Sequence, residues 1–333
     1  MDFQRVFLFL LLFISEVCFP QGEANFWYFG QNAGLNFNSG SPVVINDGAL
    51  VTEEGCSVIS NPFGELLFYT DGRTIYDRNH QIMPNGTGLL GHLSSTQSYI
   101  IIPKPGSSSI YYVFTVPYFG TGSLSYSEVD LDMNGGFGDV NEVKNVILGG
   151  NICEKLTAVR NAQGNGFWII THGVTGLTSD TGDSFFSYSI TAEGVNPNPV
   201  VSKVGVEVEG LLYRTMGYLK VSPSGKKIIA ANFGLVTESF DFNRQTGKLT
   251  NPKIISYNHS SYGVEFSLSG DVVYLTTGQA GDRDELHQYD LTANDIPSTK
   301  KILYSDVGGV EMAALQMAPD FKIYVAMTGT NFL

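Results

Sequence analysis

The sequence predicts an all-β protein, and more specifically a β-propeller built from four-stranded blades. Composition is the first reason: Gly (38), Tyr (17) and Phe (22) are abundant, and only 15% of the 333 residues are charged. This profile favours short strands joined by tight turns over helical bundles. Internal repetition is the second reason, because one strand pattern recurs six times at intervals of 45 to 60 residues. Periods of that length, with four strand signals each, are typical of propeller blades.

The recurring pattern is a five-residue aromatic or β-branched run that follows a short polar turn. Its copies are LLFYT at 66–70, YYVFT at 111–115, FWIIT at 167–171, KIIAA at 227–231, VVYLT at 272–276 and KIYVA at 322–326. An apolar strand precedes each copy, at 56–60, 98–102, 156–159, 218–222, 264–267 and 315–318. We expect these runs to be the second and first strands of each blade, joined by hairpin turns such as Ser-Pro-Ser-Gly at 222–225.

Third and fourth strands follow most copies. The third ends in an aromatic or aliphatic residue before a small polar one, at 76–77, 129–130, 188–189, 240–241 and 289–290. Weaker fourth strands follow, for example at 253–257 and 301–304. The repeat therefore supplies all four strands of a blade.

The two ends of the sequence read as parts of blades. Residues 26–29 (FWYF) look like a second strand, followed by a third at 35–40 and a fourth at 42–45, whereas the sixth copy stops at Leu333 after its second strand. Five complete blades, one begun and one finished, make seven. We therefore expect a propeller domain of residues 22–333 that is truncated at its C-terminus. Its last blade would be incomplete, leaving a gap of about one blade beside residues 26–29.

Residues 1–21 read as a signal peptide. A short n-region containing Arg5 precedes the unbroken apolar run Val6–Ile14, which is too short to span a membrane. The sequence predicts export, and no membrane span after cleavage near Gln21. Cys18 leaves a lipoprotein alternative open, although Ser15-Glu16-Val17 lacks the small residues of a lipobox.

Charge and cysteine content exclude some functions. Cleavage removes one basic and two acidic residues from the 19 and 32 of the whole chain and leaves a net charge of about −12. Nucleic acid and anionic membranes are polyanions and make poor partners for such a surface. Only Cys56 and Cys153 remain, so the chain is no disulfide scaffold. They are either bridged or two buried free thiols.

Several runs are long enough to compare with a known family. They are FWYFGQNAGL at 26–35, LFYTDG at 67–72, HQIMPNGTGLLG at 80–91, STQS at 95–98, IPKPG at 102–106 and EKLTAV at 154–159. The chain from about Asn25 to Leu333 resembles the N-terminal propeller of large secreted Bacteroidetes proteins that end in a type B (gliding-motility-associated) sorting domain of the type IX secretion system. The resemblance implies export to the cell surface or medium by the type IX machinery, through a C-terminal domain missing from this sequence. It implies no catalytic residues.

No catalytic signature stands out. The five histidines are scattered, and neither a nucleophile elbow nor a phosphate-binding loop is present. The best metal-like motif is Asp130-Leu-Asp132-Met-Asn134-Gly, whose alternating oxygens could bind Ca²⁺. The twelfth position is Asn141, so the EF-hand pattern fails, and a hairpin turn explains the same residues. We otherwise expect no cofactor.

A ligand site is predicted from the geometry of the repeat. The first strand of each blade lines the centre of a propeller, so polar residues just before these strands should ring one mouth. They are Glu54, Gln97, Glu154, Lys155, Arg214 and Glu311. Convergent polar groups at a concave mouth indicate a binding site. The same residues would also suit a solvated rim without a ligand.

Two functions remain open. The first is a non-enzymatic binding or adhesion module at the cell surface or in the medium, the N-terminal part of a longer protein, whose partner is an extracellular glycan or a surface protein. The second is a propeller enzyme acting on carbohydrate, a glycoside hydrolase or lyase, with Glu54, Glu154 and Glu311 as acid and base. Glycoside hydrolysis needs two carboxylates about 5–10 Å apart. Carboxylates that are farther apart, or that point away from the centre, favour binding.

Overall fold

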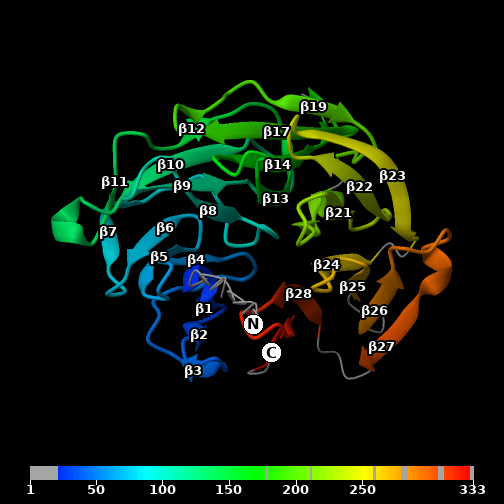
Figure 1. Ribbon diagram of the computed structural model, residues 1–333, viewed down its shortest axis with the longest axis horizontal. Coiled ribbons are helices and arrows are strands. Elements are labelled where there is room, and N and C mark those ends of the chain that lie inside the picture. The colour runs from blue at the N-terminus through cyan, green and yellow to red at the C-terminus, as the bar shows by residue number, and fades with distance from the viewer. Residues whose placement is uncertain are drawn as a thin grey trace, which may run out of the picture.

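The computed structural model describes residues 22–176, 179–210, 212–257, 260–278, 284–306 and 311–330. The predicted leader and Cys18 lie outside the described residues. Antiparallel sheets are arranged around a common axis, with one strand of each sheet innermost (Figure 1). The predicted β-propeller is thereby confirmed. None of the helices in the described ranges has the length and apolar character that crossing a membrane requires.

Five sheets form complete blades whose strands pair in sequence order. Blade 1 contains β4 (Ser57–Ser60), β5 (Leu66–Thr70), β6 (Thr74–Asp77) and β7 (Ile82–Thr87). Blade 2 contains β8 (Tyr99–Pro103), β9 (Ile110–Thr115), β10 (Ser125–Asp130) and β11 (Asp139–Val140), and β12 (Val146–Ile147) also pairs with β10. Blade 3 contains β13 (Ile152–Arg160), β14 (Phe167–Gly173), β17 (Ser184–Thr191) and β18 (Gly194–Val195), and β19 (Val200–Lys203) also pairs with β17.

The remaining elements complete the ring. Blade 4 contains β20 (Leu219–Val221), β21 (Lys227–Ala231), β22 (Thr237–Asn243) and β23 (Lys248–Ser256). Blade 5 contains β24 (Ser261–Phe266), β25 (Val272–Thr277), β26 (Asp284–Asp290) and β27 (Lys301–Asp306). The terminal segments supply β1 (Phe26–Phe29), β2 (Ala33–Asn36), β3 (Val43–Ile45), β28 (Met312–Met317) and β29 (Ile323–Met327). Smaller elements are the hairpin β15 (Thr175–Gly176) and β16 (Ser179–Asp180) and the 3-10 turns η1 (Gly22–Ala24), η2 (Asn134–Gly136), η3 (Leu212–Thr215) and η4 (Pro297–Thr299).

The predicted strands are confirmed, two of them to the residue. β5 and β21 begin and end where the repeat places them. The predicted hairpin turn at 222–225 forms because Gly225, at φ +71°, turns back so that its N–H donates to the Ser222 carbonyl. The core lies between neighbouring blades. One cluster, for example, joins Trp168, Ile170 and Phe185 of blade 3 to buried residues of blade 4.

The predicted count of seven blades is wrong, because the ring has six. β1–β3 and β28–β29 are separate sheets that lie side by side (Figure 1) and together form a sixth, composite blade. The Trp27 ring of β1 contacts the Tyr324 ring of β29, with centroids 5.7 Å apart, and Phe37 contacts Tyr324 at 5.9 Å. Aromatic contact thus fills the sector in which we expected a gap of one blade.

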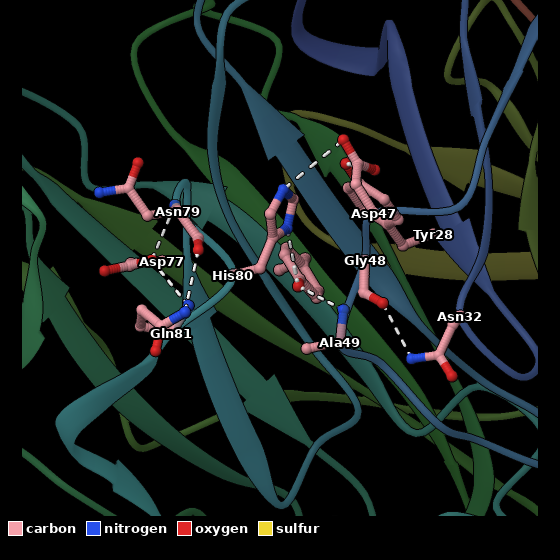
Figure 2. A network of polar contacts seen from close by, with 10 residues as sticks. Tyr28, Asn32, Asp47, Gly48, Ala49, Asp77, Asn79, His80 and Gln81 are labelled. Atoms are coloured by element: carbon pink, nitrogen blue, oxygen red, sulfur yellow. Dashed lines mark hydrogen bonds and ion pairs between the residues drawn. The ribbon is translucent and has the colours of Figure 1, made fainter.

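A polar network fastens the composite blade to blade 1 (Figure 2). The Tyr28 hydroxyl donates to Asp47 at 3.0 Å, and Asp47 lies 3.7 Å from Nε2 of His80 in the turn after β6. The buried Tyr69 hydroxyl accepts from the Ala49 N–H and also contacts His80 Nδ1 at 3.1 Å. The network joins the chain between β3 and β4 to the middle of blade 1, and thereby holds β4 and the residues before it in place.

Candidate binding site at the mouth of the ring

The six predicted mouth residues divide into two groups by position. Glu54, Gln97, Arg214 and Glu311 precede the innermost strands β4, β8, β20 and β28, as predicted. Glu154 and Lys155 instead lie within β13, which begins at Ile152, four residues earlier than expected. The strand begins early because Ile152 already pairs with Gly173 of β14. An irregularity follows, and regular pairing resumes at Leu156.

Glu154 is a wholly buried connection between blades. Its Oε2 accepts from the N–H and the hydroxyl of Thr96, at 3.0 and 3.2 Å. Its Oε1 accepts from the Phe119 N–H at 2.6 Å and from the Thr215 hydroxyl at 3.5 Å. Burial raises the pKa of this carboxyl, and the same backbone and hydroxyl donors oppose that rise. Both oxygens are therefore occupied by the protein itself.

Lys155 is equally buried, with 0% of its surface exposed. Its Nζ donates to the Met216 carbonyl at 3.0 Å, to the Ala231 carbonyl at 2.6 Å and to Asn232 Oδ1 at 3.0 Å. Burial lowers the pKa of this amine to about 8. All three ammonium protons are used inside the protein, so replacing Glu154 or Lys155 would act on folding first.

Gln97 closes an open strand edge. Its side-chain amide accepts from the Leu219 N–H at 2.7 Å and donates to the Leu219 carbonyl at 3.2 Å. Its own N–H donates to the Glu154 carbonyl. Leu219 begins β20, so Gln97 takes the place of a neighbouring strand at the inner edge of blade 4 and links it to blades 2 and 3.

Glu54 is the mouth carboxylate with unused hydrogen-bonding capacity among the described residues. The side chain is half-buried, and its buried Oε2 has no hydrogen-bond partner in the part of the chain that the structure describes. Burial raises its pKa to about 8, and the nearby charges of Glu154 and Glu53 add to this, while a hydrogen bond with Tyr262 opposes it. At pH 7 this carboxyl is mostly protonated and can both donate and accept a hydrogen bond.

The remaining two predicted residues lie at different places. Arg214, in η3, is half-buried, and its Nε has no partner among the described residues. It directly precedes Thr215, which contacts Glu154, so η3 lies beside Glu54 and Glu154. Glu311 is exposed and lies near Asp284 of blade 5. Burial is the main cause of the raised pKa of Asp284, and the negative charge of Glu311 is the second cause. Five of the six predicted residues therefore gather, and Glu311 stands apart.

Three residues of this site were missed from the sequence. Thr96 and Phe119 hold Glu154, and Tyr262 lies against Glu54. Tyr262 precedes the predicted first strand of blade 5 as Glu54 precedes that of blade 1, but a search for polar residues passes over a tyrosine. Phe119 carries φ +55°, rare for a bulky residue, and its neighbour Tyr118 stacks on His92 with ring centroids 4.0 Å apart. We call Glu54, Thr96, Phe119, Glu154 and Tyr262 the Glu54 site.

A cleft of about 330 Å³ adjoins the Glu54 site. Its lining includes Gln31, Val51, Glu53, Arg73, Tyr76 and Leu93. The cleft is joined to the Glu54 site through the backbone, because the carbonyl of the lining residue Leu93 accepts from the N–H groups of both Glu53 and Glu54. Exposed Arg73 and Glu53 place one basic and one acidic group at the cleft, and the buried Asp71 adds a second acidic group. Its volume falls at the lower end of the range for small-molecule sites.

The predicted calcium motif has the geometry of a turn. Asp130 ends β10, and its Oδ1 accepts from the Asp132 N–H at 3.0 Å, while Asn134 begins η2. Within the described ranges no group of three or more His, Cys, Asp or Glu side chains could hold a metal ion. A calcium site here stays a prediction.

Cys56 and Cys153 are free thiols, and burial raises the pKa of each to about 12.

Comparisons with solved structures agree with the architecture. The β-propeller domain of Cps50 (Swd1) from Myceliophteria thermophila is 10% identical, with 93% of this chain and 91% of that chain covered and a TM-score of 0.55. A glucose dehydrogenase is 13% identical, with 82% and 93% covered and a TM-score of 0.50. No protein family and no curated protein matches the sequence. At these identities the likeness establishes the fold alone, and the chain is a β-propeller.

Proposed function

We propose that this protein is an exported binding module that holds a saccharide at the Glu54 site and the adjoining cleft without cleaving it. The observation that carries the proposal is the unequal state of the two mouth carboxylates. Glu154 is buried and accepts from four protein donors, whereas Glu54 keeps an oxygen without a partner in the described structure.

The same observation weighs against a carbohydrate-cleaving enzyme. Hydrolysis of a glycosidic bond needs two carboxyl groups that both reach the substrate, one as acid and one as base or nucleophile. Glu154 is 0% exposed, so no substrate atom reaches it without breaking its internal bonds. Glu311 is the third carboxylate of that hypothesis, but its charge is felt at Asp284 in blade 5, where it raises the pKa. A single carboxyl group, that of Glu54, can bind a saccharide but cannot serve as both the acid and the base that hydrolysis needs.

A saccharide fits the groups at the site. A neutral carboxyl both donates to and accepts from a hydroxyl, and Gln31, Glu53 and Arg73 extend the set of polar groups along the cleft. The half-buried Phe119, whose N–H donates to Glu154, can offer a ring face to the C–H face of a pyranose, whereas the Tyr118 ring already contacts the rings of His92 and Phe119. A net charge of about −12 after removal of residues 1–21 makes a polyanion an unfavourable partner.

The Glu54 carboxyl should control binding and its pH dependence. We expect Glu54→Ala to weaken binding of the best neutral oligosaccharide from a glycan array at least tenfold, about 1.4 kcal/mol. Glu54→Gln keeps one donor and one acceptor and should stay within about threefold at pH 7. Wild-type affinity should fall above pH 8, where the carboxyl ionises and loses its proton as a donor, while the Glu54→Gln affinity stays level.

Isothermal titration calorimetry at pH 6.5 and pH 9 measures both effects. The exposed Glu142, far along the chain in blade 2, provides the matched control, and Glu142→Ala should bind as wild type. Wild-type affinity in the Glu54→Ala variant would move the ligand away from this site. An array with no saccharide bound would refute the ligand class.

Export is the second part of the proposal and rests on the leader-like residues 1–21 and on the family resemblance. We expect the protein recovered from the culture medium or the cell surface to begin close to Gly22, because the apolar run ends at Ile14 and a short polar segment follows. N-terminal sequencing checks this. A mature chain beginning at a lipid-modified Cys18 would establish the lipoprotein alternative instead.

A further inference from the structure

Arg214, in η3, is a half-buried cation without a partner in the described ranges. Its buried Nε has no hydrogen-bond partner there, and its two Nη atoms, which are not buried, have neither a hydrogen bond nor an ion pair within those ranges. The other half-buried basic side chains of the described residues each bond a carboxylate or a backbone carbonyl; they are Lys104, Lys144, Lys220, Lys227 and Arg244. The Nη donors of Arg214 thus meet solvent where the others meet protein.

The aliphatic stem of Arg214 lies against the turn that follows β21. A Cβ at Gly234 would lie 3.3 Å from Arg214 Cγ and 2.7 Å from Cε2 of Tyr213, and Gly234 has φ +76°. Glycine is needed at this position, because any side chain would displace its two neighbours. The backbone also joins η3 to the turn, since the Met216 carbonyl accepts from the Phe233 N–H at 3.3 Å. The stem is therefore supported, and the guanidinium is the free end of the side chain.

The charges beside Arg214 favour an anionic ligand. The turn after β21 also accepts two hydrogen bonds from the Lys155 ammonium. The neighbouring Glu154 offsets the charge of Lys155, and Glu54 is mostly protonated at pH 7 because burial raises its pKa to about 8. No carboxylate of the described residues forms an ion pair with Arg214. Its positive charge is therefore not neutralised by a direct partner.

Aromatic rings lie close to this cation. Tyr213 is 45% exposed, and its ring meets the half-buried Phe233 edge to face, with centroids 6.4 Å apart. Phe119 of the Glu54 site is linked to η3 through Gly120, where a Cβ would lie 3.0 Å from Cγ2 of Thr215. Exposed aromatic faces pack against the C–H face of a pyranose, and a guanidinium donates two parallel hydrogen bonds to the oxygens of an anion.

We propose that Arg214 is an anion subsite that binds one acidic sugar unit, a uronic acid or a sulfated sugar, of the saccharide held at the Glu54 site. The inference rests on the proposed function and narrows its ligand. The carboxylate or the sulfate ester supplies the acceptor oxygens that Arg214 lacks in the protein. A net charge of about −12 after removal of residues 1–21 opposes a polyanion, so the acidic unit stands in an otherwise neutral glycan.

Matched saccharides test the subsite by isothermal titration calorimetry at pH 7. In the neutral oligosaccharide that binds best, each hexose unit in turn is replaced by its uronic acid or by its 6-sulfate. At one position the wild type should bind an acidic form at least tenfold more tightly than the neutral parent, about 1.4 kcal/mol. The form that gains identifies carboxylate or sulfate as the anion. Arg214→Met should abolish the gain and bind the neutral parent within about threefold of wild type, whereas Arg214→Lys, which keeps the charge but not the planar fork, should retain part of the gain.

Arg160→Met is the matched control, because it removes the same charge from an exposed residue about 20 Å along β13 from Glu154. This variant should keep the full gain. The melting temperature of Arg214→Met should equal that of the wild type, since its guanidinium bonds no described residue. A gain that persists in Arg214→Met would overturn the proposal. Equal affinity of the wild type for acidic and neutral forms would do so too, while Glu54-dependent binding of the neutral parent would leave the proposed function standing. Absence of binding to every saccharide would refute both.

Discussion

Replacing Lys155 with methionine is expected to lower the free energy of unfolding by about 3–5 kcal/mol, the range for breaking a buried charged contact by removing one partner. Methionine has a similar length but no donor. The Met216 carbonyl, the Ala231 carbonyl and Asn232 Oδ1 would then lose the ammonium group that they share at 2.6–3.0 Å. Glu154 would also lose the neighbouring positive charge that favours its ionised form.

Urea denaturation followed by fluorescence measures this loss. Lys226→Met is the control, because Lys226 is an exposed residue of the same type in blade 4, and its change should stay within about 0.5 kcal/mol of zero. A loss below about 1 kcal/mol for Lys155→Met would mean that removing the desolvation penalty of the amine offsets the three hydrogen bonds. That result would contradict a stabilising role for Lys155.

Glu154→Gln is expected to reduce both stability and binding. A carboxylate accepts at both ends, whereas an amide accepts only at its oxygen, so its NH₂ group must face either the Thr96 donors or those of Phe119 and Thr215. Buried donors without an acceptor cost about 1–3 kcal/mol each. We expect a loss of about 2–4 kcal/mol in the free energy of unfolding, because one or two donors lose their acceptor.

The effect on binding has a separate cause. The bond of 2.6 Å to Glu154 holds the Phe119 N–H, and with it a backbone at φ +55° that costs about 1–3 kcal/mol for a residue other than glycine. Loss of the carboxylate should let the Tyr118-Phe119 segment relax, and saccharide affinity should fall by at least fivefold. Denaturation and titration of Glu54→Gln give the contrast, since that variant should keep both properties at pH 7. Unchanged affinity in Glu154→Gln would separate the Phe119 backbone from the binding site.

How much of the fold follows from sequence is clearest in the strands. β5 and β21 match their predicted bounds because aromatic and β-branched side chains favour extended backbone: Phe68, Tyr69 and Thr70 do so in β5, and Ile228 and Ile229 in β21. The turn before β21 follows equally from local chemistry, since Gly225 tolerates a positive φ. Strand order within the blades follows too, because short hairpin connections leave few alternatives.

The candidate site could be predicted only in part. The position of Glu54 before an innermost strand follows from the repeat, and its buried Oε2 has no hydrogen-bond partner among the described residues. The residues Glu154 and Lys155 share that sequence pattern but lie wholly inside the protein. Charged side chains are rarely buried unless paired, so sequence alone favours exposure. Their partners come from distant segments around Thr96, Phe119 and Met216, which no local pattern connects to β13.

The sequence by itself therefore determined the propeller, its strands and turns, and the neighbourhood of Glu54. Only the tertiary structure decided the number of blades and the division of the mouth residues into internal connections and a half-buried carboxyl with one unpartnered oxygen. The physical reason is the sequence separation over which each kind of interaction acts. Strand and turn preferences act between residues a few positions apart, whereas ring closure depends on contacts such as that of Trp27 with Tyr324, at opposite ends of the chain. The burial of a charge likewise depends on which distant donors and acceptors surround it.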